Sequence, residues 1–174
     1  MTRPTLYLMV GYPGAGKTTT AKLIHDITGA VHLWADHERS RRFQKPTHSH
    51  KENLELYAQL NEETRQLLSE GKSVIFDTNF NFYKDREHLR QIADAEGART
   101  VVVWITTDKT LARDRAVAHP SPNETRIWGN MPSEAFERIT GNLQEPRAGE
   151  HPLMLNGKDM TRDVVERALA TLAA

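Results

Sequence analysis

Residues 11–18, with the sequence GYPGAGKT, fit the pattern G-x-x-x-x-G-K-[ST] of a phosphate-binding loop, or P-loop. The glycines allow positive φ angles, so the backbone can turn its N–H groups inward around an anion. We expect Lys17 to reach the β- and γ-phosphates of a nucleoside triphosphate and the Thr18 hydroxyl to ligate Mg²⁺. The helix that opens at Lys17 adds the positive end of its dipole. The predicted nucleotide-binding residues are Gly11, Tyr12, Pro13, Gly14, Ala15, Gly16, Lys17, Thr18 and Thr19.

A second candidate is Asp77, which follows the apolar segment 73–76 and begins Asp77-Thr78-Asn79. A carboxylate that ends a hydrophobic strand beside a P-loop is typical of a residue that holds Mg²⁺ and its waters. The alternative is a simple turn, because Asp and Asn favour strand ends for backbone hydrogen bonding. We expect Asp77 and Thr18 to hold Mg²⁺, with ATP and Mg²⁺ as the cofactors.

Asp36 follows a short apolar segment, residues 31–34, and Arg39 comes one helical turn later. A hydroxyl that attacks a γ-phosphate gains from a carboxylate that orients it and takes its proton, and Asp36 is placed for that role. Arg39 can hold a phosphate or the charge of the transition state. The alternative for Asp36 is an ordinary helix cap, since Asp is favoured at helix starts. Both roles are compatible, because one oxygen can cap while the other faces the cleft.

Arginines in the second half of the chain are candidates for a closing lid. Arg113 and Arg115 lie in a predicted helix, 108–118, and Arg126 lies in the proline-containing loop beyond it. Phosphoryl transfer builds negative charge that arginines on a lid can stabilise while they exclude water. The alternative is an amphipathic helix with solvated charges. We expect a lid over about residues 108–130 and a catalytic role for at least one of these arginines, together with Lys17, Asp36 and Arg39.

Short apolar segments alternate with segments of helical periodicity along the chain. This alternation predicts one α/β domain, residues 1–174, with a parallel sheet covered by helices on both faces. The carboxyl ends of parallel strands meet at one edge, so the P-loop, Asp36 and Asp77 are expected to converge. The predicted strands are 5–10, 31–34, 73–76, 100–105 and 153–155. The predicted helices are 17–28, 36–43, 52–70, a segment around 89–93, 108–118, a segment around 136–143 and a last helix capped by Thr161.

Composition excludes several classes of protein. The chain has 174 residues, 38% of them hydrophobic and 26% charged, which are values of a globular domain. It has no cysteine, hence no disulfide and no thiolate metal site, as is usual in the cytoplasm, where we expect the protein. No apolar run approaches a membrane span of roughly 20 residues. The formal net charge is zero, so attraction to nucleic acid must be local.

Together these motifs resemble the P-loop kinases related to polynucleotide kinase and the zeta-toxin group. The resemblance rests on GYPGAGKTT, on Asp36 followed by Arg39, and on VIFDTNFN before a charged helix, and it covers about residues 5–120. It implies a P-loop NTPase fold, a three-layer α/β sandwich whose parallel five-stranded sheet has the order 2-3-1-4-5, with a helical lid. It also implies that Asp36 is the base and that a lid arginine falls on Arg113 or Arg115.

The sequence departs from the resemblance beside the proposed base, where Ala35 and His37 replace more polar residues. This departure bears on the acceptor more than on phosphoryl transfer. Residues 37–51 form a concentrated positive stretch, with Glu38 as their one acidic residue. Such a stretch suits a phosphorylated acceptor or a nucleic-acid end, although a solvated helix face explains it equally. Its cationic residues are Arg39, Arg41, Arg42, Lys45 and Lys51.

The predicted function is therefore an ATP-dependent kinase that transfers the γ-phosphate to a hydroxyl acceptor. A polynucleotide 5′-hydroxyl is one candidate acceptor. Alternatives are a small-molecule kinase for a sugar nucleotide, nucleoside or antibiotic, and a regulatory ATP-binding or ATPase module without transfer. The segment 106–109, TTDK, does not supply the guanine-reading motif of a GTPase.

Overall fold

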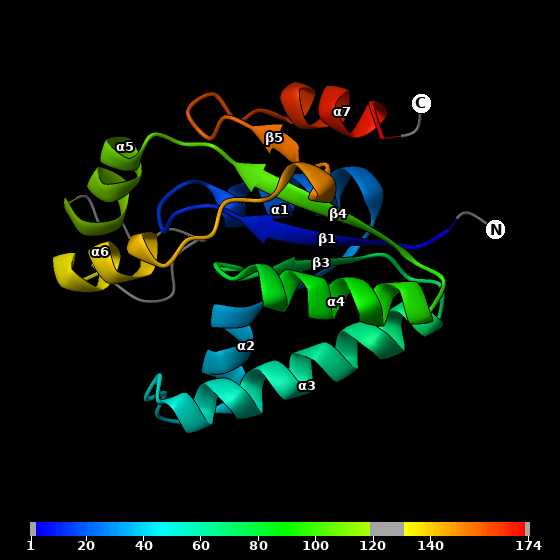
Figure 1. The fold of residues 1–174 in the computed structure, drawn as a ribbon, viewed down its shortest axis with the longest axis horizontal. Coiled ribbons are helices and arrows are strands. Elements are labelled where there is room, and N and C mark those ends of the chain that lie inside the picture. The colour runs from blue at the N-terminus through cyan, green and yellow to red at the C-terminus, as the bar shows by residue number, and fades with distance from the viewer. Residues whose placement is uncertain (1–2, 119–130, 173–174) are drawn as a thin grey trace.

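Five parallel strands form the centre of the structure, a computed structural model that describes residues 3–118 and 131–172 (Figure 1). The sheet order is β2-β3-β1-β4-β5, which confirms the predicted order. Every neighbouring pair of strands is parallel. The strands are β1 (Thr5–Val10), β2 (Val31–Trp34), β3 (Val74–Asp77), β4 (Arg99–Ile105) and β5 (Leu153–Leu155).

The central strand β1 is buried at every residue, as a continuous apolar run predicts for a strand that is covered on both faces. Leu6 and Leu8 belong to one hydrophobic core with side chains of α3 and α4. Tyr7 and Met9 belong to a second core with side chains of α1 and α7. The sheet therefore separates two cores, which is the three-layer α/β sandwich expected from the sequence.

The helices lie on both faces of the sheet (Figure 1). Helices α1 and α7 lie on one face, whereas α3 and α4 lie on the other, and α2, α5 and α6 lie near the carboxyl ends of the strands. The helices are α1 (Lys17–Thr28), α2 (Ala35–Arg42), α3 (His50–Ser69), α4 (Tyr83–Ala95), α5 (Lys109–Arg113), the π-helical turn η1 (Asp114–Ala118), α6 (Ser133–Gly141), the 3₁₀ turn η2 (Ala148–Glu150) and α7 (Arg162–Ala170).

The ends of two helices follow from their caps. Helix α3 begins at His50, two residues before the predicted start, because the Ser49 hydroxyl accepts a hydrogen bond from the Glu52 N–H at 3.2 Å. Thr161 caps α7 in the same way, as predicted. The predicted helix 108–118 is divided, since α5 continues into the π-helical turn η1.

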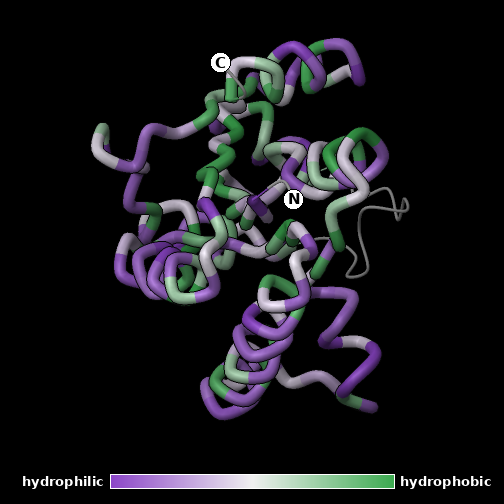
Figure 2. The backbone as a smooth tube through the Cα atoms, turned by 90° about the vertical axis from the view of Figure 1, so that its right-hand side faces the viewer, coloured by the Kyte–Doolittle hydropathy of each residue, from purple (hydrophilic) through white to green (hydrophobic). Residues whose placement is uncertain are grey.

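Hydrophobic residues follow the central strands, whereas the helices alternate between hydrophobic and hydrophilic residues along their length (Figure 2). This is the pattern of helices that pack one side on a sheet and turn the other to solvent. Within residues 3–118 and 131–172, no helix has the length and apolar character needed to cross a lipid bilayer.

Candidate active site

The P-loop joins β1 to α1 at the carboxyl edge of the sheet. Gly11, Gly14 and Gly16 have φ angles of 152°, 77° and 108°, so all three adopt the positive values predicted for them. Gly16 precedes the first turn of α1, and no side chain caps that turn. Its N–H groups therefore point out of the helix end, where an anion can accept hydrogen bonds from them.

Lys17 is the cation of this loop. Its Nζ donates to the backbone oxygens of Gly11 and Tyr12, both at 2.9 Å. Only 9% of the residue is exposed. Burial lowers the pKa of Lys17 to about 8, although the charges of Asp77 and Asp36 partly oppose that shift. Both carboxylates act on the lysine, so the structure brings together the residues expected at this edge.

Asp77 ends β3 and is buried, with 2% of the residue exposed. One of its oxygens, Oδ2, lies 3.0 Å from Nε2 of His32 on the edge strand β2. A carboxylate and a threonine hydroxyl are hard oxygen donors of the kind that Mg²⁺ prefers, so Asp77 and Thr18 fit the predicted metal.

Sequence reasoning did not single out His32. It lies two residues before Trp34 in β2, and its ring stacks at 6.2 Å between centroids on the Trp34 ring. The contact between His32 and Asp77 joins residues 45 apart in the chain. The sequence offered no signal for it, because it depends on strand pairing: the register sets Trp34 opposite Asp77 and His32 opposite Ile75, and the His32 ring reaches Asp77 diagonally.

Asp36 lies in the first turn of α2 and is exposed, and Trp34 rather than Asp36 occupies the cap position. The nearby phenol of Tyr57 lies 2.7 Å from the Thr78 hydroxyl. The pKa of Tyr57 is raised, mainly because the phenol is buried and also because the negative charge of Asp36 acts on it. The hydrogen bond with Thr78 and the charge of Arg39 partly oppose this shift. Tyr57 is therefore close to both members of the Asp36/Arg39 pair.

Arg39 is buried and faces α3 rather than solvent. One terminal nitrogen donates to Glu52, and the other donates to Oδ1 of Asn53 at 2.7 Å. Its Nε is buried without a hydrogen-bond partner in the described structure. The sequence led us to expect that Arg39 holds a phosphate, but its guanidinium already has a carboxylate partner.

Acidic residues of α2 and α3 pair with the arginines of the positive stretch after Asp36. Arg42 pairs with Glu38 of its own helix at 3.0 Å and with Glu63 of α3 at 2.5 Å. Arg41 also pairs with Glu38, at 2.6 Å. With Arg39 on Glu52, all three arginines of the stretch have carboxylate partners.

The two described lid arginines have different surroundings. Arg113 donates to the Ser133 hydroxyl at 2.5 Å and lies 3.4 Å from Glu137, so it faces α6. Arg115 donates to the backbone oxygen of Gly157 at 3.1 Å. Arg126 and much of the predicted lid lie outside the described residues.

Gly157 and Thr107 are site residues that sequence reasoning missed. The Thr107 hydroxyl donates to the backbone oxygen of Ala15 in the P-loop at 2.6 Å. A Cβ on Gly157 would lie 2.0 Å from that oxygen and 2.2 Å from the Thr107 hydroxyl, so only glycine fits this approach. The segment after β5 therefore packs directly on the P-loop, and the Asn-Gly pair at 156–157 was its only local signal.

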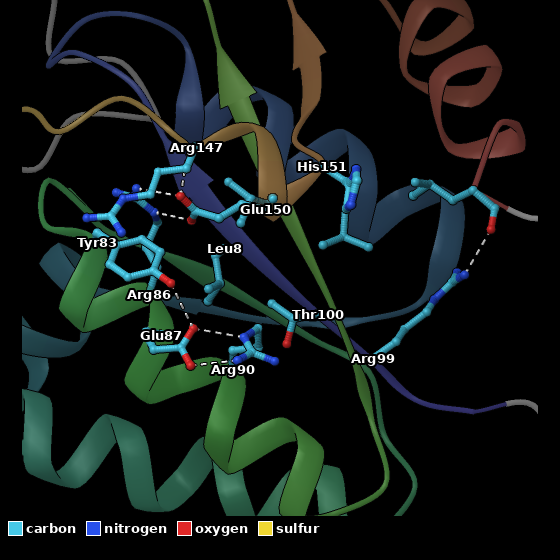
Figure 3. Close-up of a pocket in the computed structure, with 14 residues that line it drawn as sticks. Leu8, Tyr83, Arg86, Glu87, Arg90, Arg99, Thr100, Arg147, Glu150 and His151 are labelled. Atoms are coloured by element: carbon cyan, nitrogen blue, oxygen red, sulfur yellow. Dashed lines mark hydrogen bonds and ion pairs between the residues drawn. The ribbon is translucent and has the colours of Figure 1, made fainter.

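A cavity of about 710 Å³ lies away from the P-loop, between α4, the first half of β4 and η2 (Figure 3). Arg86 donates to both oxygens of Glu150, at 2.7 and 2.9 Å. The Arg147 guanidinium stacks 3.6 Å from the centroid of the Tyr83 ring. Arg86 also donates to the backbone oxygens of Phe80 and Gln144, so its charge is paired and four of its five N–H donors bind within the fold.

Comparison with known proteins places the chain in a family. A family model described as an AAA domain matches residues 6–146. No curated protein matches the sequence. The matched range includes the P-loop, Asp36 and Asp77.

Solved structures share the fold at low sequence identity. A sugar kinase from Janibacter sp. HTCC2649 has a TM-score of 0.71 at 17% identity, with 99% of this chain and 95% of that chain covered. A gluconokinase from Sinorhizobium meliloti 1021 has a TM-score of 0.69 at 17% identity, with 99% and 94% covered. A chain in the structure of the Pnkp1/Rnl/Hen1 RNA repair complex has a TM-score of 0.67 at 19% identity, with 82% of this chain and 45% of that chain covered. The chain belongs to the AAA domain family, and its fold is that of the P-loop kinases.

Proposed function

We propose that the protein is an ATP-dependent kinase that transfers the γ-phosphate of ATP to a hydroxyl group of an acceptor. The observation that carries this proposal is the environment of Lys17. It is a buried cation at the start of α1, with a pKa lowered to about 8, in the field of Asp36 and Asp77. A triphosphate supplies the negative charge that this lysine lacks, and two carboxylates remain for the metal and for the acceptor proton.

Each residue then has one task. Lys17 and the first N–H groups of α1 bind the phosphates. Thr18 and Asp77 would hold Mg²⁺, which neutralises charge on the β- and γ-phosphates when it is bound. Asp36 orients the acceptor hydroxyl and takes its proton while the acceptor oxygen attacks the γ-phosphorus.

Among the arginines we assign the lid role to Arg115 before Arg113. Arg115 reaches the segment that packs on the P-loop, whereas Arg113 faces Ser133 and Glu137 of α6. Replacing Arg113, Arg115 and Arg126 singly with methionine tests the assignment. The loss should be concentrated in kcat for at least one variant, because the contact forms in the transition state. If all three variants keep the wild-type kcat, these arginines have no catalytic role and are only surface charges.

The acceptor class is part of the proposal. The fold is shared with proteins described as a sugar kinase, a gluconokinase and a component of an RNA repair complex, so the fold by itself does not select the acceptor. The closer relation to polynucleotide kinase and zeta-toxin kinases that the motifs suggest remains a proposal of the same kind. A regulatory ATP-binding module without transfer is the alternative.

The deciding experiment is ADP release, measured with and without pools of hydroxyl-bearing acceptors and γ-labelled ATP. A kinase transfers the label to an acceptor and releases ADP faster in its presence. Lys17→Ala should abolish both signals and weaken ATP binding, because the triphosphate loses the lysine of the P-loop. Lys72→Ala is the matched control, since Lys72 is exposed and pairs with Glu70 far from the P-loop. ATP binding without label transfer to any acceptor would support the regulatory module.

A further inference from the structure

Arg39 lies one turn after the proposed base, where an arginine can bind a charged group of the acceptor. Its guanidinium is instead engaged by Glu52 and Asn53 of α3. Arg39 and Glu52 are 4% and 7% exposed. An anionic part of an acceptor would therefore meet a neutral ion pair at this position and not a free cation.

Glu52 is held by more than Arg39. It accepts hydrogen bonds from the Thr47 N–H at 2.6 Å, from the Thr47 hydroxyl at 2.8 Å and from the His48 N–H at 3.2 Å. Burial raises the pKa of Glu52, but the donors of Thr47, Arg39 and His48 outweigh it and hold that pKa at about 2. A phosphate that bound Arg39 would have to displace a carboxylate that four donors fix, and would leave that carboxylate without its cation.

Hydroxyl and amide groups lie beside the Asp36/Arg39 pair. Tyr57 and Thr78 form a hydroxyl pair at 2.7 Å, and the charges of Asp36 and Arg39 both act on the phenol. Oδ1 of Asn53 accepts a hydrogen bond from Arg39, whereas the Arg39 Nε has no hydrogen-bond partner in the described structure. Hydroxyl and amide groups both donate and accept, and they recognise the hydroxyls of an uncharged ligand better than they compensate a full negative charge.

We propose that the acceptor is an uncharged polyhydroxyl compound, such as a sugar, a polyol or a nucleoside, and not a phosphorylated molecule or a nucleic-acid end. This inference rests on the proposed kinase function. In the reaction the acceptor O–H gives its proton to the Asp36 carboxylate, and the acceptor oxygen forms a bond to the γ-phosphorus. The bond from that phosphorus to the β–γ bridging oxygen breaks, and ADP leaves with the electron pair. Asp36 then returns the proton to solvent.

The test uses acceptors that differ in charge and keep the same attacking hydroxyl. One series is a nucleoside, its 3′-monophosphate and a 5′-hydroxyl oligonucleotide, and another is a hexose, the matching hexonate and a hexose phosphate. For the series that accepts label, kcat/KM should be at least about tenfold higher for the neutral member, because the Arg39 charge beside the proposed base is already neutralised by Glu52. Equal or higher kcat/KM for a phosphorylated member would overturn the proposal.

Glu52→Gln sharpens the test, because it releases the Arg39 charge without changing the size of the side chain. The ratio of kcat/KM for phosphorylated over neutral acceptors should rise by about tenfold, the worth of one charge-assisted hydrogen bond. Glu63→Gln is the matched control, since Glu63 neutralises Arg42 at the surface and should leave the ratio unchanged. An unchanged ratio in folded Glu52→Gln protein would contradict the proposal.

Three further outcomes keep the proposal separate from the kinase function. If Glu52→Gln does not fold, as circular dichroism would show, the wild-type series decide alone. If no acceptor of either charge takes label while ATP still binds, the kinase function fails. If label goes only to charged acceptors, the kinase function stands and the uncharged acceptor is wrong.

Discussion

Arg86 and Lys17 are both buried cations, but the protein treats their charges in opposite ways. Arg86, on the α4 side, directs its donors at both oxygens of Glu150 and at two backbone oxygens, and is 1% exposed (Figure 3). Lys17, at the carboxyl edge, donates to the backbone oxygens of Gly11 and Tyr12 and, among residues 3–118 and 131–172, to no carboxylate. Both side chains lose their hydration, and only Arg86 regains a carboxylate in exchange.

This difference distinguishes a cation that stabilises the fold, Arg86, from one that is available to a ligand, Lys17. A buried charge costs several kcal/mol unless a partner compensates it, so a cation left with carbonyl partners is poised for an anionic ligand. Arg39 resembles Arg86 in having a glutamate partner, although it lies beside the proposed base. Whether a cationic side chain already has a carboxylate partner is thus a better guide to ligand binding than its distance from the site.

The largest expected effect comes from Lys17→Met, which removes the uncompensated charge and keeps most of the volume. Phosphoryl transfer should fall to background, because no other P-loop side chain neutralises the phosphates. The free energy of unfolding should stay equal or rise, since a desolvated ammonium is lost. Label transfer and urea denaturation measure the two quantities. A clear loss of stability in this variant would make Lys17 a structural residue like Arg86.

Asp36→Asn should follow in size. We expect kcat to fall about 10²–10⁴-fold, the usual contribution of a general base, with nearly unchanged affinity for ATP·Mg²⁺. Asp36 is exposed, so the thermal midpoint should not move. Single-turnover transfer and calorimetric titration with ATP separate chemistry from binding. Normal turnover in this variant would leave Asp36 with a role in the helix start only.

Arg86→Met should show the reverse pattern. The unpaired Glu150 should cost about 3 kcal/mol of unfolding free energy, the lower end of the range for broken buried ion pairs, because Glu150 lines an open cavity and can regain water. ATP affinity measured below the unfolding transition should not change. The double variant Arg86→Met/Glu150→Met is the control, and it should recover part of the loss. Equal stability of the single variant and the wild type would refute the architectural role of this pair.

The smallest effect is a pH dependence that only Lys17 should produce. Its pKa is about 8 in the folded protein and 10.5 as a reference, so between these values the unfolded chain binds the extra proton. The stability of the wild type relative to Lys17→Met should therefore rise as pH increases from 8 towards 10.5. ATP needs the charged form, so its affinity should fall by about tenfold at pH 9 relative to its value well below pH 8. Calorimetry in buffers of different ionisation enthalpy should detect proton uptake on ATP binding above pH 8, and the absence of uptake would contradict the assignment.

Local patterns were sufficient for the strands, most helices and the P-loop. The apolar run of β1 and the glycine spacing each describe an arrangement within a few residues of chain, where sequence distance and spatial distance agree. The division of helix 108–118 into α5 and a π-helical turn was not predictable in this way. It occurs where Gly14 meets Ala112, since a Cβ on that glycine would lie 2.3 Å from the Ala112 oxygen.

The sequence by itself determined that a phosphate-binding loop follows a buried strand, and that carboxylates end the neighbouring strands of a parallel sheet. Only the tertiary structure decided which charges remain available, because Glu52 reaches Arg39 across 13 residues and Glu150 reaches Arg86 across 64. It also decided that the His32 ring contacts the Asp77 carboxylate and that the backbone of Gly157 packs against the Ala15 oxygen. The physical reason is that two charges compensate each other only when they are close in space. Packing brings together segments that are far apart in the sequence, and the sequence pattern of each segment alone does not show this.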